Sequence, residues 1–164
     1  LLAGSEVPVT IGVLAILAFL MFIKNNRKAL LAVHAIMLGG TALVGVATFA
    51  FQQGWVGPAT WMILIGLGLY AAYVPYGCIL FDRLIATVGA IGTAGFLIYV
   101  TDAFGYLGAV ALMVYKDLGN PDLSWLDFFI KASYATSIAC TVLYLVTFLY
   151  FWRSTSADTK SAEA

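Results

Sequence analysis

Asp102 stands near the middle of the longest apolar stretch of the chain, residues 84–116, which reads LIATVGAIGTAGFLIYVTDAFGYLGAVALMVYK. A carboxylate at the centre of a membrane span costs about 2.5 kcal/mol or more on insertion scales, so it needs a reason to be there. One reading is a protonatable or cation-binding group in a transport path. The other is a structural Asp that bonds a Tyr hydroxyl or, with Thr101, caps a restarted half-helix.

Other polar side chains could join Asp102. Tyr99 and Tyr106 lie at i−3 and i+4 from it, on the same side of a helix. In the next apolar segment a polar stripe recurs at helical spacing, made of Lys131, Tyr134, Ser137, Thr141 and Tyr144. Lys131 either snorkels outward along its stem or reaches Asp102 on the neighbouring helix. The candidate pathway residues are therefore Asp102, Tyr99, Tyr106, Lys131 and Tyr134.

Tyr73 and Tyr76 flank Pro75 in an earlier apolar segment. Proline removes one helix hydrogen bond, so we expect a kink that frees a carbonyl group near these phenols. Each tyrosine could line a substrate path or simply pack with its hydroxyl satisfied.

Two short charged stretches are candidates for a gate or for fixing topology. They contain Lys24, Arg27 and Lys28 in the first, and Asp82 and Arg83 in the second. Arg83 either anchors the end of a span or contacts another loop as part of a gate.

Nothing in the sequence predicts an enzyme, a cofactor or a metal site. His34 is the only histidine, which leaves a packing role or a proton relay but argues against a metal or haem site. Gly89, Gly92 and Gly95 do not form a dinucleotide motif, and we interpret them as a face for close helix packing. With no basic stripe, a nucleic-acid partner is not expected.

The composition identifies the elements that must position these residues. The chain is 63% hydrophobic and 10% charged, whereas a soluble domain carries about 25% charged residues. We therefore predict an all-α, polytopic membrane helix bundle in the lipid bilayer. Five transmembrane helices are expected, over residues 7–23, 29–51, 58–81, 84–116 and 125–152.

The positive charges predict the orientation of these spans. Lys24, Arg27, Lys28, Arg83 and Arg153 fall on one side, which should be cytoplasmic. Residues 1–153 would then form the bundle, and residues 154–164 a disordered cytoplasmic tail. Ser124 and Asp127 predict a capping box at the start of the last helix. The chain begins without Met and has an odd number of spans, so we expect further helices of the same polypeptide upstream.

The layout resembles the C-terminal half of a major facilitator superfamily transporter, helices eight to twelve. The residues KNNRK at 24–28 lie where that family has R-x-G-R-K, although Asn26 replaces the glycine and Ile23 the acidic residue. GLGLYAAYVPYGCILFDRLIA from Gly66, GFLIYVTDAFGYLGAV from Gly95 and LSWLDFF from Leu123 are similar to an uncharacterised bacterial family of such proteins. The resemblance implies a twelve-helix monomer working by alternating access in the inner membrane.

The expected function is that of a secondary-active transporter fragment, moving an unidentified small solute with a proton or cation coupled at Asp102. The alternative is a non-transporting multi-pass membrane protein, such as a sensor, scaffold or assembly factor. A third possibility is a complete five-span protein that oligomerises through its Gly-rich faces.

Overall fold

The computed structural model describes residues 2–89, 93–119 and 122–162, and the side chains of residues 6–89, 93–119 and 122–153. Every regular element in these ranges is a helix. In order they are α1 (Leu2–Met21), α2 (Asn26–Gln52), α3 (Pro58–Pro75), a π-helical turn (Tyr76–Leu80), α4 (Phe81–Val88), α5 (Ala94–Val114), a second π-helical turn (Tyr115–Gly119) and α6 (Trp125–Ala162).

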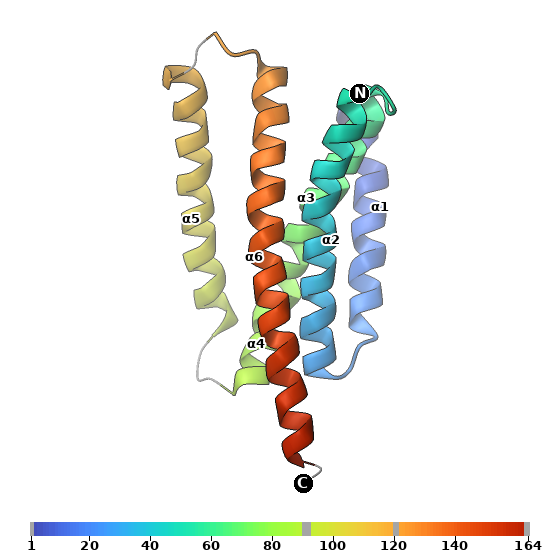
Figure 1. Ribbon diagram of the computed structural model, residues 1–164, viewed down its shortest axis with the longest axis vertical. Coiled ribbons are helices and arrows are strands. Elements are labelled where there is room, and N and C mark those ends of the chain that lie inside the picture. The colour runs from blue at the N-terminus through green and yellow to red at the C-terminus, as the bar shows by residue number, and fades with distance from the viewer. Residues whose placement is uncertain (1, 90–92, 120–121, 163–164) are drawn as a thin grey trace.

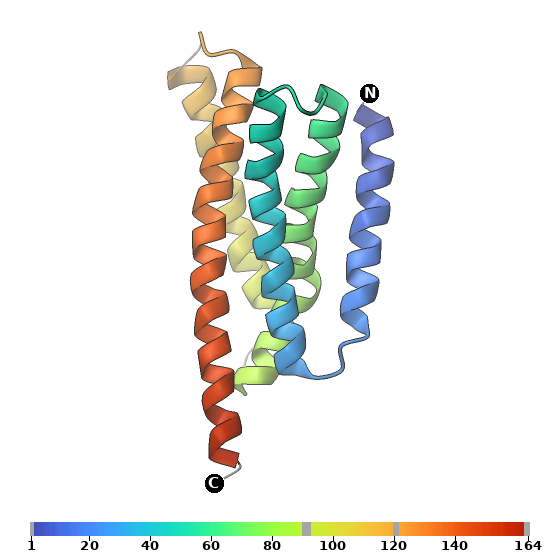
Figure 2. The same ribbon diagram turned by 45° about the vertical axis from the view of Figure 1, so that its right-hand side comes forward.

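The helices run between the two ends of an elongated bundle (Figures 1 and 2). Within the described ranges, four helical runs are long and apolar enough to cross a membrane, over 26–52, 58–88, 94–119 and 125–153. The apolar helix over Glu6–Met21 is shorter. The all-α fold and four of the predicted spans are thus confirmed, and the chain is a multi-pass integral membrane protein.

Local sequence signals set most helix ends. The Asn25 side chain caps α2 by accepting a hydrogen bond from the Lys28 N–H at 3.1 Å. Ahead of α6, Ser124 Oγ accepts from the Asp127 N–H at 3.1 Å and donates to Asp127 Oδ2 at 2.7 Å. The Ser124 half of the predicted capping box is confirmed, whereas the Asp127 carboxylate accepts from the Ser124 hydroxyl and not from its backbone N–H. Helix α6 continues past Arg153, and the side chains of 154–164 lie outside the described ranges, so the disordered tail stays a prediction.

The predicted boundary between the third and fourth spans is wrong. Asp82 and Arg83 do not separate two spans but lie inside α4. The helix ends instead at Gly89, whose left-handed φ of 71° stops it. The next helix starts after Thr93, which accepts a hydrogen bond from the Phe96 N–H. Gly89 therefore forms a helix end rather than a packing face, and Gly92 lies outside the described residues.

Pro75 disturbs its helix as the sequence predicts, although not by breaking it. The chain passes from α3 through the π-helical turn Tyr76–Leu80 directly into α4. A π turn spaces the backbone hydrogen bonds one residue further apart, which accommodates the missing N–H and the bulk of the proline ring. The wide turn carries Tyr76 and Cys78 just ahead of Asp82 and Arg83.

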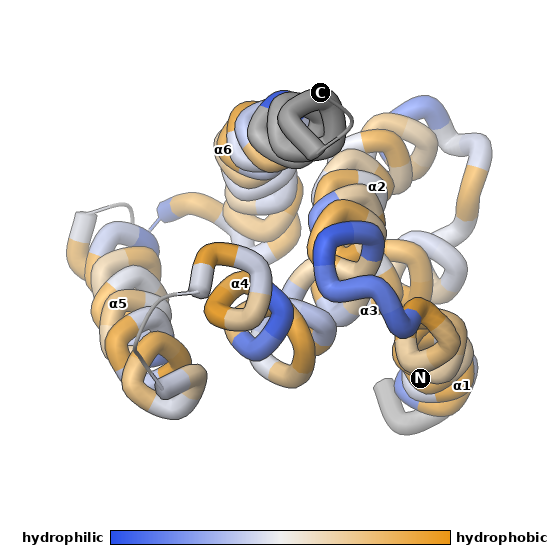
Figure 3. The backbone as a smooth tube through the Cα atoms, turned by 90° about the horizontal axis from the view of Figure 1, so that it is seen from below, coloured by the Kyte–Doolittle hydropathy of each residue, from blue (hydrophilic) through white to orange (hydrophobic). Residues whose placement is uncertain are grey.

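Helix α2 forms the centre of the bundle, with α3 on one side and α6 on another, and α1 packs along α3 (Figure 1). Buried side chains gather in two clusters, one of Leu20, Leu30, Val33, Met37 and Leu80, the other of Val44, Ala47, Trp61 and Ile65. Helix α5 differs, because none of its residues is buried. It stands at the side of the bundle and contacts α4 near its start (Figure 3).

Candidate functional site

Asp102 lies eight residues into α5, about 12 Å along the axis from Ala94. Its side chain is half-buried. The half-buried positions of α5 recur at helical spacing, at Ala94, Leu97, Ile98, Thr101 and Asp102. Asp102 therefore stands at the end of the one face that α5 turns toward the bundle, about a third of the way along a candidate span.

No described residue forms a hydrogen bond or an ion pair with Asp102. The alternative of a helix restart at this point is wrong, because α5 runs unbroken from Ala94 to Val114. The Thr101 hydroxyl instead donates back to the carbonyl oxygens of Leu97 and Ile98, each at 2.9 Å. The Thr101 hydroxyl is therefore satisfied within its own helix and does not donate a hydrogen bond to the Asp102 carboxylate.

The structure does not gather the predicted partners around Asp102. Tyr99 and Tyr106 are 77% and 75% exposed, so both phenols point outward from the bundle. Lys131 is exposed on α6, and it forms no ion pair with Asp102 in the described part of the chain. The alternative in which Lys131 reaches Asp102 is not found there. Asp102 lies eight residues from the Ala94 end of α5 and Lys131 six residues from the Trp125 end of α6, and these helix starts are at opposite ends of the bundle (Figure 1).

The polar stripe of α6 forms a ladder of hydrogen bonds with α2. Tyr134 donates its hydroxyl proton to Gln52 Oε1 at 2.7 Å. The Ser137 hydroxyl donates to the Thr41 carbonyl oxygen at 2.7 Å, and the Thr141 hydroxyl donates to Thr41 Oγ1 at 3.1 Å. Such bonds between membrane helices hold the helices in register. The stripe predicted as a pathway is in large part an interhelical contact.

Tyr73 and Tyr76 differ in their exposure. Tyr73 is exposed, whereas Tyr76 is half-buried and its ring lies 5.0 Å from the ring of Phe81. The single histidine, His34, is buried, and its Nδ1 donates to the Leu30 carbonyl oxygen at 2.8 Å. This is the packing role that the sequence left open for His34.

The basic end of the bundle holds the second set of predicted residues. Arg83 Nη1 donates a hydrogen bond to Asn26 Oδ1, which joins α4 to the first turn of α2. A groove of about 340 Å³ lies beside this contact and is lined in part by Cys78, Asp82 and Arg83. Figure 3 shows the hydrophilic segment of α4 next to the hydrophilic start of α2, where Lys24, Arg27 and Lys28 also lie.

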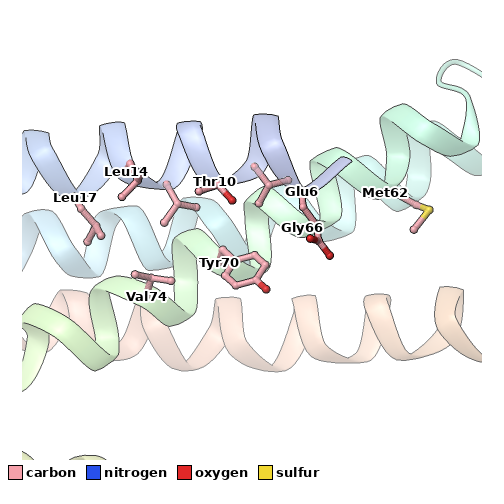
Figure 4. A pocket seen from close by; sticks show the side chains of 10 residues that line it. Glu6, Thr10, Leu14, Leu17, Met62, Gly66, Tyr70 and Val74 are labelled. Atoms are coloured by element: carbon pink, nitrogen blue, oxygen red, sulfur yellow. The ribbon is translucent and has the colours of Figure 1, made fainter. Parts of the chain in front are cut away.

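One further site was not predicted. A groove of about 360 Å³ lies between α1 and α3, and Glu6, Thr10 and Tyr70 supply its polar groups (Figure 4). Glu6 is the only acidic residue before Asp82. That isolation is the signal of this site in the sequence, and it is a weak one because Glu6 precedes the first apolar run.

Comparisons with known proteins place the whole bundle in one family. A family model described as "Family of unknown function (DUF5690)" matches residues 1–154. The comparisons with curated proteins and with solved structures found no match.

Proposed function

The chain belongs to the DUF5690 family of unknown function, and we propose that this member is part of a secondary-active transporter for a small solute. Asp102 would bind the coupled proton or cation. The observation that carries the proposal is a half-buried carboxylate, inside a membrane span, with no hydrogen-bond or ion-pair partner among the described residues.

The cost of that carboxylate explains the proposed role. An ionised group within a span is disfavoured unless it is paired, hydrogen-bonded or neutralised. In the absence of a partner from the protein, a proton or a bound cation supplies the neutralising charge. A group that must gain and lose such a charge as its surroundings change is what coupled transport requires.

The loose attachment of α5 supports the same role. Its residues are all at least partly exposed, so moving α5 disrupts few buried contacts. The proposal includes further helices of the same polypeptide that would cover the exposed face of α5. In a major-facilitator-like arrangement, the C-terminal half would rock against those helices to give alternating access.

The proposed orientation places the C-terminal end of α6 in the cytoplasm of a bacterium, with the protein in the inner membrane. Helix α6 extends beyond the end of the bundle where α2 begins (Figure 2). The basic residues Lys24, Arg27, Lys28 and Arg83 lie at this same end. Clustered Lys and Arg residues mark the cytoplasmic side of a membrane protein.

The test is electrical. Full-length protein reconstituted on a solid-supported membrane is exposed to concentration jumps of small solutes at several pH values. The wild type should give a transient current that depends on pH with at least one solute. Asp102→Asn should lose the pH dependence, while Asp122→Asn, the same change at an exposed acid between α5 and α6, should keep it.

Two outcomes would refute the proposal. If Asp102→Asn keeps the wild-type pH dependence, the coupling role is wrong. If the folded wild type gives no current with any solute, the transport proposal is wrong and the non-transporting alternative is favoured. The hydrogen-bonded α2–α6 contact favours that alternative because a fixed framework suits a sensor, scaffold or assembly factor.

A further inference from the structure

The groove between α1 and α3 combines one negative charge with a long apolar wall. Glu6 and Thr10 come from α1 and Tyr70 from α3, and apolar side chains such as Leu14, Leu17 and Val74 continue the lining (Figure 4). The polar groups lie between Met62 at one end of the groove and Leu14, Leu17 and Val74 at the other. We infer that this groove binds an organic cation, a protonated amine attached to an apolar body.

The two helices fit closely beside the groove. A Cβ on Gly66 would lie 3.1 Å from Val9, and one on Gly12 would lie 2.8 Å from Leu67, so the helix surfaces touch at these glycines. Beside this seam the larger side chains of Glu6 and Tyr70 border the opening. Val9 and Gly66 of this seam also line the groove, so the helix contact itself shapes one side of the site.

Charge and shape select the class of ligand. The Glu6 carboxylate has no ion-pair partner among the described side chains, so it can pair with an ammonium group and would repel an anion. The Tyr70 hydroxyl can accept a hydrogen bond from the same ammonium group, and its ring can contact it through a cation–π interaction. A single carboxylate is a poor site for a bare divalent cation, because Ca²⁺ takes six to eight oxygen ligands.

The size of the groove limits the apolar body. Its volume of about 360 Å³ lies at the lower end of the range for small-molecule sites, about 300 to 1,000 Å³. An amine with one aromatic ring fits this space, with the ring along Leu14 and Val74. The site lies on α1 and α3 and is separate from Asp102 on α5, so the inference does not depend on coupled transport.

The experiment measures binding at equilibrium. Full-length protein in lipid nanodiscs is titrated with tritiated phenethylamine in a scintillation proximity assay, and empty nanodiscs supply the background. 2-Phenylethanol and 3-phenylpropionate serve as neutral and anionic competitors of similar shape. Unlabelled phenethylamine should displace the probe at a concentration at least tenfold lower than either competitor.

The variants locate the binding. Glu6→Gln should weaken binding of phenethylamine at least tenfold, and Glu6→Asp should retain most of it. Asp122→Asn, a change to an exposed acid in the α5–α6 connection, should have no effect. Equal binding by wild type and Glu6→Gln would overturn the inference, as would equal losses in Glu6→Gln and Asp122→Asn. If Glu6→Gln does not fold, the competitor series on the wild type decides, because competitors as strong as the amine overturn the inference on their own.

Discussion

The carbonyl oxygen of Gly40 lies 2.6 Å from the position that a Cβ on Gly68 would occupy. The carbonyl oxygen of Gly68 likewise lies 2.6 Å from the position that a Cβ on Gly40 would occupy. Two backbones therefore meet directly where α2 crosses α3. Small residues allow this approach in membranes, where van der Waals packing rather than water exclusion drives helix association. The crossing fixes the position of α3. It therefore also sets where the α1–α3 groove lies and where the chain continues into α4, which carries Arg83.

We expect Gly40→Ala to lower the free energy of unfolding by about 1–3 kcal/mol, since the added methyl group forces two backbones apart. Gly39→Ala is the matched control, because a Cβ there meets no atom within 4 Å and alanine is the better helix former by about 1 kcal/mol. Thermal unfolding in nanodiscs, followed by tryptophan fluorescence, measures both. Equal melting temperatures for the two variants would contradict the direct contact between the helices.

The α2–α6 ladder makes a second prediction about stability. Ser137→Val removes the hydrogen bond to the Thr41 carbonyl group and adds bulk beside Gly45, where a Cβ would lie 2.5 Å from Ser137 Oγ. Interhelical polar contacts in membranes contribute about 0.6 kcal/mol on average, and overpacking adds about 1–3 kcal/mol to the loss. Thr136→Val, at an exposed neighbouring position, should leave the melting temperature within about a degree of the wild type. A similar small effect from Ser137→Val would show that the two helices are not held together here.

The contact between Arg83 and Asn26 can be followed through Cys78, an exposed cysteine in the same groove. In a Cys140→Ser background, we expect Arg83→Ala and Asn26→Ala each to raise the rate of maleimide labelling severalfold. The double variant should label no faster than either single variant, because both changes remove one shared contact. Lys28→Ala, a loss of charge in the same turn of α2, should leave the rate unchanged. Additive increases in the double variant would mean that the two residues act separately.

The sequence was sufficient to predict the class of fold and the starts of α3 and α6, because these depend on hydropathy and on residues close in the chain. Ser124 and Asp127 cap α6 as expected, and Pro75 disturbs its helix as expected. The end of α4 could not be predicted because Gly89 stops the helix only through its left-handed backbone conformation. A glycine inside an apolar run can equally continue a helix, so the sequence does not show which conformation it adopts.

The positions around the candidate site depended on helix rotation, which hydropathy alone leaves undetermined in a membrane. The stripe containing Tyr134 and Ser137 could face α2 or α5 with equal local propensity. Hydrogen bonding to Gln52 and Thr41 fixed it against α2. The Glu6 groove needed two helices far apart in the sequence to lie side by side.

The separation of Asp102 from Lys131 gives a final prediction. Asp102→Asn and Lys131→Ala should have independent effects on stability and on the solute-driven current, because the two side chains form no ion pair in the described structure. The double variant should therefore show the sum of the single losses, within about 0.5 kcal/mol for stability. Lys131→Ala alone should change little, since an exposed lysine near a helix end contributes through its solvated charge. Rescue of the Lys131→Ala phenotype by Asp102→Asn would instead show that the charges meet during the working cycle.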